Sequence, residues 1–281
     1  MKRFAVFFAF LLMVPFFCCA FSKVESTGKN ALILMSLEEE QQLGAESYNE
    51  ILKESTISKN ATYNKRLETV AKRLIEAVGT DAPEGTEWEY NVIEDDQVNA
   101  FAVPGGKIAV YSGLMAIASD DELAYVVGHE LGHVTARHGA QRMSQETVIS
   151  LVGSLVQGSL KSDRSQAIFS IAYGLGSEYG LVLPYSRKNE YEADDLGSLY
   201  AARAGYNPDG GLSMLKKLKE LGGSSSVPEW LSTHPLDDNR IQKLQQLYER
   251  NVAEYKKAAE AQKAQEAKNT KNNKNSKGKR R

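Results

Sequence analysis

Three of the four histidines in this 281-residue chain lie close together, at positions 129, 133 and 138. The first two, with the glutamate that follows the first, form the pattern His129-Glu130-Leu131-Gly132-His133. On a helix, residues four apart lie on the same face, one turn apart. Two imidazoles so placed can bind one metal ion, typically zinc, and the adjacent glutamate can act on water beside it. The spacing therefore predicts a zinc-dependent hydrolase, most simply a protease.

The sequence around this motif predicts the helix that the chemistry needs. Ser119 and Glu122 form a capping box ahead of an apolar run at 123–127, and we expect the helix to end near Gly139. Upstream, two β-rich runs flank Pro-Gly-Gly at 104–106, which is typical of a hairpin. A further strand is expected at 88–93, and helices at 37–53, 64–78, 187–204, 212–221 and 241–255. The apolar stretch 148–185 is expected to form one or two core helices.

Two histidines do not complete a catalytic zinc site, which takes three protein ligands and keeps a further position for water. The only cysteines, Cys18 and Cys19, lie in an N-terminal apolar run, so the third ligand should be a histidine or a carboxylate. His138 is one candidate, although local packing at the helix end suits it better. Glu190 and Asp194 form a better pair: one can bind metal while the other supports a ligand histidine. On spacing alone, a solvated charged helix face is the more common explanation.

Several short motifs occur together in a characteristic order. The chain resembles the family of zinc metalloendopeptidases that contains the CAAX prenyl proteases, the membrane heat-shock protease HtpX and periplasmic peptidases such as BepA. The resemblance covers about residues 37–247. The motifs that carry it are His129 to His133, Glu190 to Asp194 after Ser186-Arg187, Asn99-Ala100-Phe101-Ala102 before Pro104-Gly105-Gly106, and Ser232-Thr233-His234-Pro235 followed by Arg240.

The resemblance implies the fold, the cofactor and the principal site residues. The fold would be α+β and mostly helical: a zincin-like (gluzincin) metalloprotease domain with a small sheet beside the zinc helix. His129, His133 and Glu190 would bind one zinc ion, and Glu130 would be the general base. The substrate would be unfolded or misassembled polypeptide, and the role envelope protein quality control.

Further residues would support this chemistry. The resemblance implies that Asp194 orients a ligand histidine, and that His234 either stabilises the transition state or occludes the open metal position. Arg240 would add a further donor. The strand that begins with Asn99, Ala100 and Phe101 would bind an extended substrate by strand addition if it borders the cleft. An ordinary core hairpin is the alternative for that strand.

The N-terminus predicts export. Lys2 and Arg3 precede an uncharged run at 4–21, and small residues at 18 and 20 suit cleavage after Ala20. Residues 1–20 are therefore interpreted as a signal peptide, with a membrane anchor or lipid attachment as the alternative. We expect a periplasmic protein, with peripheral or lipid-anchored membrane association left open. The transmembrane helices of the prenyl proteases and HtpX, and a following helical-repeat domain, are not expected.

Charge divides the chain into two parts. Residues 256–281 carry ten Lys/Arg and two Glu, so with Lys2 and Arg3 also set aside, the formal total of −2 leaves residues 20–255 at −12. An acidic body argues against nucleic-acid binding. We expect a zinc metallopeptidase domain at 21–255 and a basic tail at 256–281, disordered from about residue 269. The alternative function is a chaperone or assembly factor whose zinc site is latched and weakly active.

Overall fold

The computed structural model describes residues 21–159, 183–223 and 228–278. The expected signal peptide lies outside these residues, as does much of the apolar stretch 148–185. The described part is mostly helical with two small sheets, which confirms the α+β expectation. The strands are β1 (Phe21–Lys23), β2 (Asn30–Leu32), β3 (Glu89–Ile93), β4 (Ala100–Val103) and β5 (Lys107–Tyr111). The helices are α2 (Leu37–Glu54), α3 (Ala61–Val78), η1 (Gly79–Asp81), α4 (Ser112–Ile117), α5 (Asp120–Thr135), α6 (His138–Ser159), α8 (Leu183–Arg203), α9 (Asp209–Gly222), α10 (Glu229–Thr233) and α11 (Asp238–Gly278).

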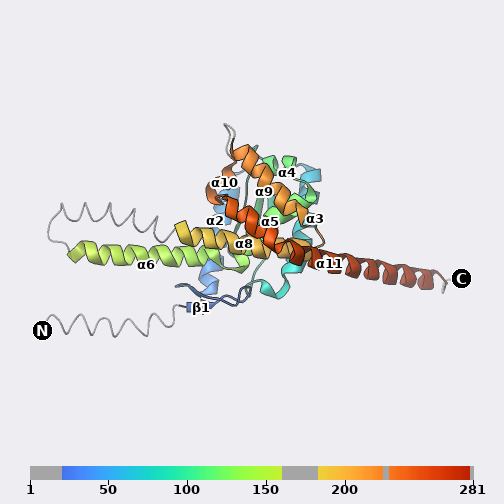
Figure 1. The fold of residues 1–281 in the computed structure, drawn as a ribbon, viewed down its shortest axis with the longest axis horizontal. Coiled ribbons are helices and arrows are strands. Elements are labelled where there is room, and N and C mark those ends of the chain that lie inside the picture. The colour runs from blue at the N-terminus through green and yellow to red at the C-terminus, as the bar shows by residue number, and fades with distance from the viewer. Residues whose placement is uncertain (1–20, 160–182, 224–227, 279–281) are drawn as a thin grey trace.

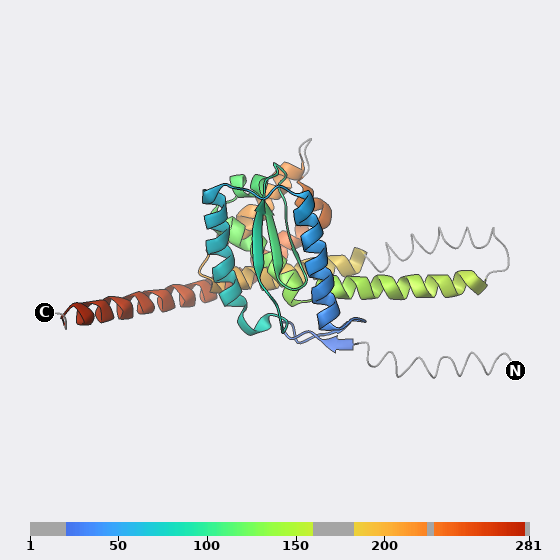
Figure 2. The ribbon, with the colours of Figure 1, turned by 180° about the vertical axis from the view of Figure 1, so that it is seen from behind.

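The larger sheet has the order β3–β5–β4 and lies between α2 and α3 (Figure 2). The predicted hairpin is confirmed: β4 and β5 are antiparallel, and Gly105 and Gly106 take positive φ angles of 83° in the turn. Because successive strand residues face opposite sides, Ile108 joins the core beneath α3 and α5 while Ala109 packs with Tyr48 of α2. Among the described residues, no strand pairs with the outer edge of β4.

Helices α5 and α8 pack unusually closely because small residues face each other across the contact. A Cβ atom on Gly197 of α8 would lie 2.4 Å from the backbone nitrogen of His129, and one on Gly128 would lie 2.6 Å from the Gly197 carbonyl oxygen. One turn along, a Cβ on Gly132 would lie 2.8 Å from the Ala193 carbonyl oxygen. The close approach brings side chains of α8 within reach of those on α5.

The helix that carries the HExxH motif ends earlier than predicted. α5 stops at Thr135, and α6 begins at His138 rather than after a break at Gly139. Arg137 between them has φ 57°, the only positive φ of a non-glycine residue in the described ranges. Its guanidinium lies 2.6 Å from the Glu40 carboxylate of α2, which fixes this turn. The sequence-based boundary was wrong because a tertiary ion pair holds an arginine in a conformation that usually requires glycine.

Helix α6 extends away from the body, on the side opposite to α11 (Figure 1). Its apolar residues Leu151, Val152, Leu155 and Val156 are exposed, so the expectation of a core helix is wrong for this portion. None of the helices in the described part of the chain is long and apolar enough to span a bilayer.

Helix α11 is longer than the sequence predicted. It continues to Gly278, whereas disorder was expected from about residue 269. Residues 256–268 are rich in alanine and lysine, which are strong helix formers and carry the helix past residue 255, whereas residues 269–278 are mainly asparagine and lysine. The domain boundaries at 21–255 and 256–281 stay predictions.

Candidate metal centre

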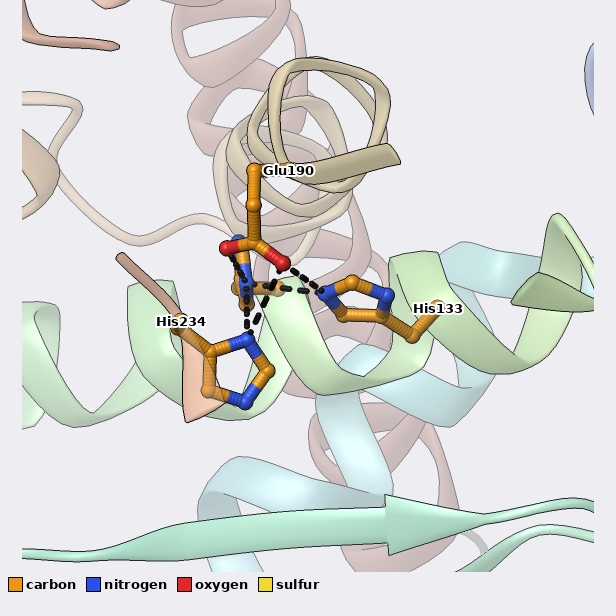
Figure 3. Close-up of side chains that lie close together, drawn as sticks. His133, Glu190 and His234 are labelled. Atoms are coloured by element: carbon orange, nitrogen blue, oxygen red, sulfur yellow. Dashed lines mark hydrogen bonds and ion pairs between the residues drawn. The ribbon is translucent and has the colours of Figure 1, made fainter. Parts of the chain in front are cut away.

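Four side chains from three parts of the chain converge at one point. His129 and His133 come from α5, Glu190 from α8, and His234 from the residue after α10. One nitrogen or oxygen atom from each lies within 4.8 Å of all the others. Figure 3 shows Glu190, His133 and His234 pointing toward one another from three different directions. His129, Glu190 and His234 are buried, and only the edge of His133 reaches solvent.

The distances between these atoms suit a small tetrahedral cation. His129 Nε2 lies 3.0 Å from His133 Nε2, 3.2 Å from His234 Nδ1 and 3.4 Å from Glu190 Oε2. Glu190 Oε1 lies 3.3 Å from both His133 Nε2 and His234 Nδ1. Donor atoms about 2.0–2.1 Å from a tetrahedral zinc ion would be separated by about 3.3–3.4 Å. The cluster therefore already has the spacing of a zinc ligand set.

Asp194 fixes the orientation of His129. Asp194 Oδ1 lies 2.8 Å from His129 Nδ1 and accepts a hydrogen bond from the Tyr125 hydroxyl at 2.7 Å. Arg240 donates to both carboxylate oxygens at 2.8 Å. Since an ionised carboxylate only accepts, His129 carries a hydrogen on Nδ1, and Nε2 is the nitrogen that faces the cluster and would bind a metal ion once the ring is neutral. Asp194 and Arg240, which were expected to support the site, thus lie in contact with His129 and with each other, and their roles stay predictions.

The group carries an excess of negative charge. Glu130, Glu190 and Asp194 are at most 3% exposed, with one buried arginine, Arg240, among them. Glu190 Oε2 lies 2.9 Å from Arg240 Nη1, in an ion pair without the angle of a hydrogen bond. Arg240 also donates to both oxygens of Asp194, so this one cation is shared between two buried carboxylates and cannot neutralise both. A divalent metal ion fits both the charge and the donors.

The pKa values of His129, Glu190 and His133 are shifted by burial and by the contacts among these residues. Burial opposes charge on His129, but hydrogen bonds to Asp194 and Glu190 outweigh it and raise the His129 pKa to about 9. Burial would raise the Glu190 pKa, yet the close contacts with His129, His133 and His234 hold it far below its usual range. Burial lowers the pKa of His133 well below its ordinary value, which keeps that ring neutral. The site thus stabilises a positive charge on His129 beside the carboxylates. It also keeps the His133 ring neutral, so that this ring can donate a lone pair to a metal ion.

Glu130, the predicted general base, is held by a residue that the sequence analysis missed. Trp230 Nε1 donates a hydrogen bond to Glu130 Oε1 at 3.0 Å, and the Trp230 ring stacks on His234 with centroids 4.7 Å apart. His234 Nε2 lies 3.4 Å from the same Glu130 oxygen. The available signal was a tryptophan four residues before His234, just ahead of the late motif.

The predicted substrate strand lies beside this region, but its side chains do not converge on the cluster. Ala100 is buried in the main core, and the Phe101 ring packs edge-on against Tyr48 at 6.3 Å. Trp230 N donates to the Val98 carbonyl at 3.2 Å, just before β4 begins. Asn99 Oδ1 accepts from the Ala100 backbone N–H at 2.9 Å. Contact of this strand with a substrate would therefore involve its main chain.

Comparison with known proteins identifies relatives that are named as metalloendopeptidases or proteases. The chain is 28% identical to mitochondrial metalloendopeptidase OMA1 of Schizosaccharomyces pombe over 214 residues, covering 75% of this chain and 62% of that protein. It is 27% identical to the beta-barrel assembly-enhancing protease of Escherichia coli strain K12, covering 82% of this chain and 48% of that protein. The crystal structure of S. mikatae Ste24p matches with a TM-score of 0.44 and 20% identity, covering 67% of this chain and 50% of that chain.

These curated relatives are longer proteins, of which the chain spans about half to two thirds. Residues 61–248 match the description "Peptidase family M48", a range that contains every residue of the metal cluster and its supporting carboxylate and arginine. The resemblance inferred from the short motifs is confirmed, and the chain belongs to peptidase family M48.

Proposed function

We propose that this protein is a zinc metalloendopeptidase that hydrolyses peptide bonds of exported proteins. The observation that carries the proposal is the buried cluster of three imidazoles and one carboxylate, with Glu130 beside it. Membership of peptidase family M48 supports the reaction class. The relatives named above are a metalloendopeptidase and a protease, which is the same class of chemistry.

In this proposal His129, His133 and Glu190 hold the zinc ion. Bound zinc would supply Lewis acidity, which lowers the pKa of water towards neutrality and polarises a peptide carbonyl. Asp194 keeps His129 in the tautomer that presents Nε2 to the metal. His234 either donates to the developing oxyanion or occupies the position that water needs.

In this proposal Glu130 transfers a proton from the attacking water to the leaving amine. Its Oε1 is held by the Trp230 indole N–H at 3.0 Å, which fixes the carboxylate plane and leaves Oε2 to accept a proton from the attacking water. The same oxygen then returns the proton to the leaving amine. Because Glu130 is nearly fully buried, few solvent molecules compete for that proton.

The outer edge of β4 supports the choice of substrate. Since no described strand pairs with that edge, an extended polypeptide can add there through main-chain hydrogen bonds. Such binding depends on backbone more than on side chains, so we propose unfolded or misassembled polypeptide as the substrate class. We extend the proposal to a role in envelope quality control, with export to the periplasm and peripheral or lipid-mediated membrane attachment, which the N-terminal sequence and the family resemblance support.

A second function is favoured by one observation, the position of His234. Its Nδ1 lies 3.2 Å from His129 Nε2 and 3.3 Å from Glu190 Oε1, where it would complete the ligand set and exclude water. A protein in this state would bind unfolded chains without cleaving them. The alternative is therefore a chaperone or assembly factor with a latched zinc site.

One experiment distinguishes the protease from the chaperone or assembly factor. Digestion of casein by the purified protein is compared with that by Glu130→Gln and by a matched control, Glu146→Gln, which changes an exposed glutamate on α6. Cleavage by the parent and control, lost in Glu130→Gln and on chelation, supports the protease. If the parent binds zinc yet cleaves nothing, His234→Ala is tested next: recovered cleavage indicates a latch, and continued silence contradicts the protease.

A further inference from the structure

The second zinc-facing histidine, His133, has a partner on its other ring nitrogen. His133 Nδ1 lies 2.9 Å from Nδ1 of His138, the residue that begins α6. On the far side of that ring, His138 Nε2 lies 3.2 Å from Glu192 Oε2. Lys29, on the turn between β1 and β2, lies 2.5 Å from the other Glu192 oxygen. A chain of four side chains thus leads from the protein surface to the metal cluster.

The hydrogens in this chain can be assigned from its far end. An ionised Glu192 only accepts, so His138 carries its hydrogen on Nε2 and, as a neutral ring, offers a lone pair at Nδ1. That lone pair must accept from His133, whose hydrogen therefore lies on Nδ1. The His133 Nε2 lone pair then faces Glu190 Oε1, 3.3 Å away, inside the cluster. Glu192 thereby determines which nitrogen of His133 is free for metal.

The backbone is shaped to make this contact. Arg137 takes its left-handed conformation immediately before His138, and the turn brings the first residue of α6 back against the last turn of α5. Such a conformation is unfavourable for a residue with a side chain, so a contact elsewhere must hold it. The ion pair between Arg137 and Glu40 does so. His138 is buried and contacts solvent hardly at all, which rules out a merely surface role.

We propose that His138 is a positioning residue for the metal ligand His133, and that Glu192 keeps His138 in the required tautomer. This inference rests on the proposed function, since it assumes that His133 binds zinc. It also distinguishes the two histidines of the motif: His129 is oriented directly by a carboxylate, and His133 through an intervening imidazole. Loss of a partner of this kind typically weakens metal binding by about 10–100-fold.

The test measures zinc affinity by competition with a chromophoric chelator, on the full chain. His138→Phe keeps a ring but offers no acceptor to His133, and we expect its zinc Kd to rise by about 10–100-fold. His138→Asn places an oxygen near the position of Nδ1, so it should recover much of the loss. Arg142→Ala, which removes an exposed cation from the same turns of α6, is the control and should match the parent.

A double-mutant cycle with His133→Ala excludes a general effect on folding. If His138 acts through His133, then adding His138→Phe to His133→Ala should change the zinc Kd by less than about twofold. A structural role would instead lower affinity in both backgrounds. Thermal melts of the metal-free proteins check that each variant folds. If His138→Phe does not fold, Glu192→Leu decides, because it leaves His138 Nε2 without its acceptor. A several-fold weaker zinc affinity is then expected, and an unchanged one overturns the proposal.

The outcomes separate this inference from the function on which it rests. A parent that binds no zinc contradicts both. A parent that binds zinc, with His138→Phe and Asn variants that bind it equally well, overturns the positioning role and leaves the peptidase proposal intact. Equal loss in the Phe and Asn variants would also overturn it, since the acceptor atom would then be irrelevant.

Discussion

Replacing Arg240 with methionine is the sharpest test of how the metal site is held together. Arg240 is 1% exposed and donates to both oxygens of Asp194 at 2.8 Å. Its Nη1 lies 2.9 Å from Glu190 Oε2, and its guanidinium lies 5.3 Å from the centre of the Trp230 ring. Methionine is unbranched and apolar, so it removes the charge while filling much of the space. The variant would leave two buried carboxylates without their cation.

The expected loss is large. Removal of one partner from a buried ion pair typically destabilises a protein by about 3–5 kcal/mol, because the other charge stays buried and unpaired. For a protein of this size each kcal/mol corresponds to about 2–4 °C in Tm, so the metal-free variant should melt about 6–20 °C below the parent. Zinc should recover part of the loss, since it would neutralise Glu190 from the opposite side.

The loss should also depend on pH. Burial raises the pKa of Asp194, but the charge of Arg240 and the bond to His129 outweigh it and hold that pKa below the ordinary value. A carboxylate with a depressed pKa stabilises the fold above its unfolded pKa of about 3.9, and this contribution disappears as pH falls through the folded pKa. Without Arg240 the Asp194 pKa rises. The difference between parent and variant should therefore be greatest at neutral pH and shrink on acidification.

The matched control is Arg250→Met on the same helix. Arg250 pairs with Asp195, the neighbour of Asp194, but both side chains are about 40% exposed. Exposed pairs contribute about 0–1 kcal/mol, so this variant should lie close to the parent. Urea unfolding in the presence of chelator, at neutral and acidic pH, measures both variants. If Arg240→Met costs no more than Arg250→Met, the account of Arg240 as the counter-ion of the buried carboxylates is refuted.

Three further changes have expected outcomes. Gly197→Ala would place a Cβ 2.4 Å from the His129 backbone nitrogen, so it should force α5 and α8 apart. We expect the free energy of unfolding in urea to fall by about 1–3 kcal/mol and zinc binding to weaken. An unchanged zinc Kd would contradict the close-packing argument. Trp230→Phe keeps an aromatic ring but loses the indole donor to Glu130, so kcat should fall while the zinc Kd stays constant; an unaltered kcat would show that the hydrogen bond is dispensable. Zinc at 1,000 times its Kd should add about 4 kcal/mol to stability, and the absence of any Tm increase would exclude a native-state zinc site.

Local patterns predicted the elements that carry the site. The capping box at Ser119 and Glu122 is present and starts α5 where expected, because both partners lie within four residues. The hairpin turn at 104–106 was also predicted from local sequence, because two adjacent glycines supply the positive φ angles that the turn needs. Most other helix and strand ends shifted by a few residues, whereas α11 extends more than twenty residues past its predicted end.

Contacts between distant segments could not be read from spacing. Trp230 meets Glu130 across 100 residues and His138 meets Glu192 across 54, and no periodicity relates such positions. His138 illustrates the limit well. The sequence identified it as a candidate ligand or a local packing residue, whereas its contact with His133 depends on the left-handed Arg137, which is itself held by a glutamate on α2.

The free-energy cost of burying charged side chains explains why the carboxylates, the arginine and a metal-binding cluster occur together. Glu130, Glu190, Asp194 and Arg240 are each at most 3% exposed, and removing four charges from water is unfavourable unless every charge is compensated. One guanidinium cannot neutralise three carboxylates, so a deficit of positive charge remains, which a protonated His129 reduces in the metal-free protein and a divalent metal ion can remove. The close packing of α5 on α8 creates this deficit by forcing the carboxylates together. The metal ion is therefore expected to stabilise the fold as well as to serve catalysis, and the same two helices determine both.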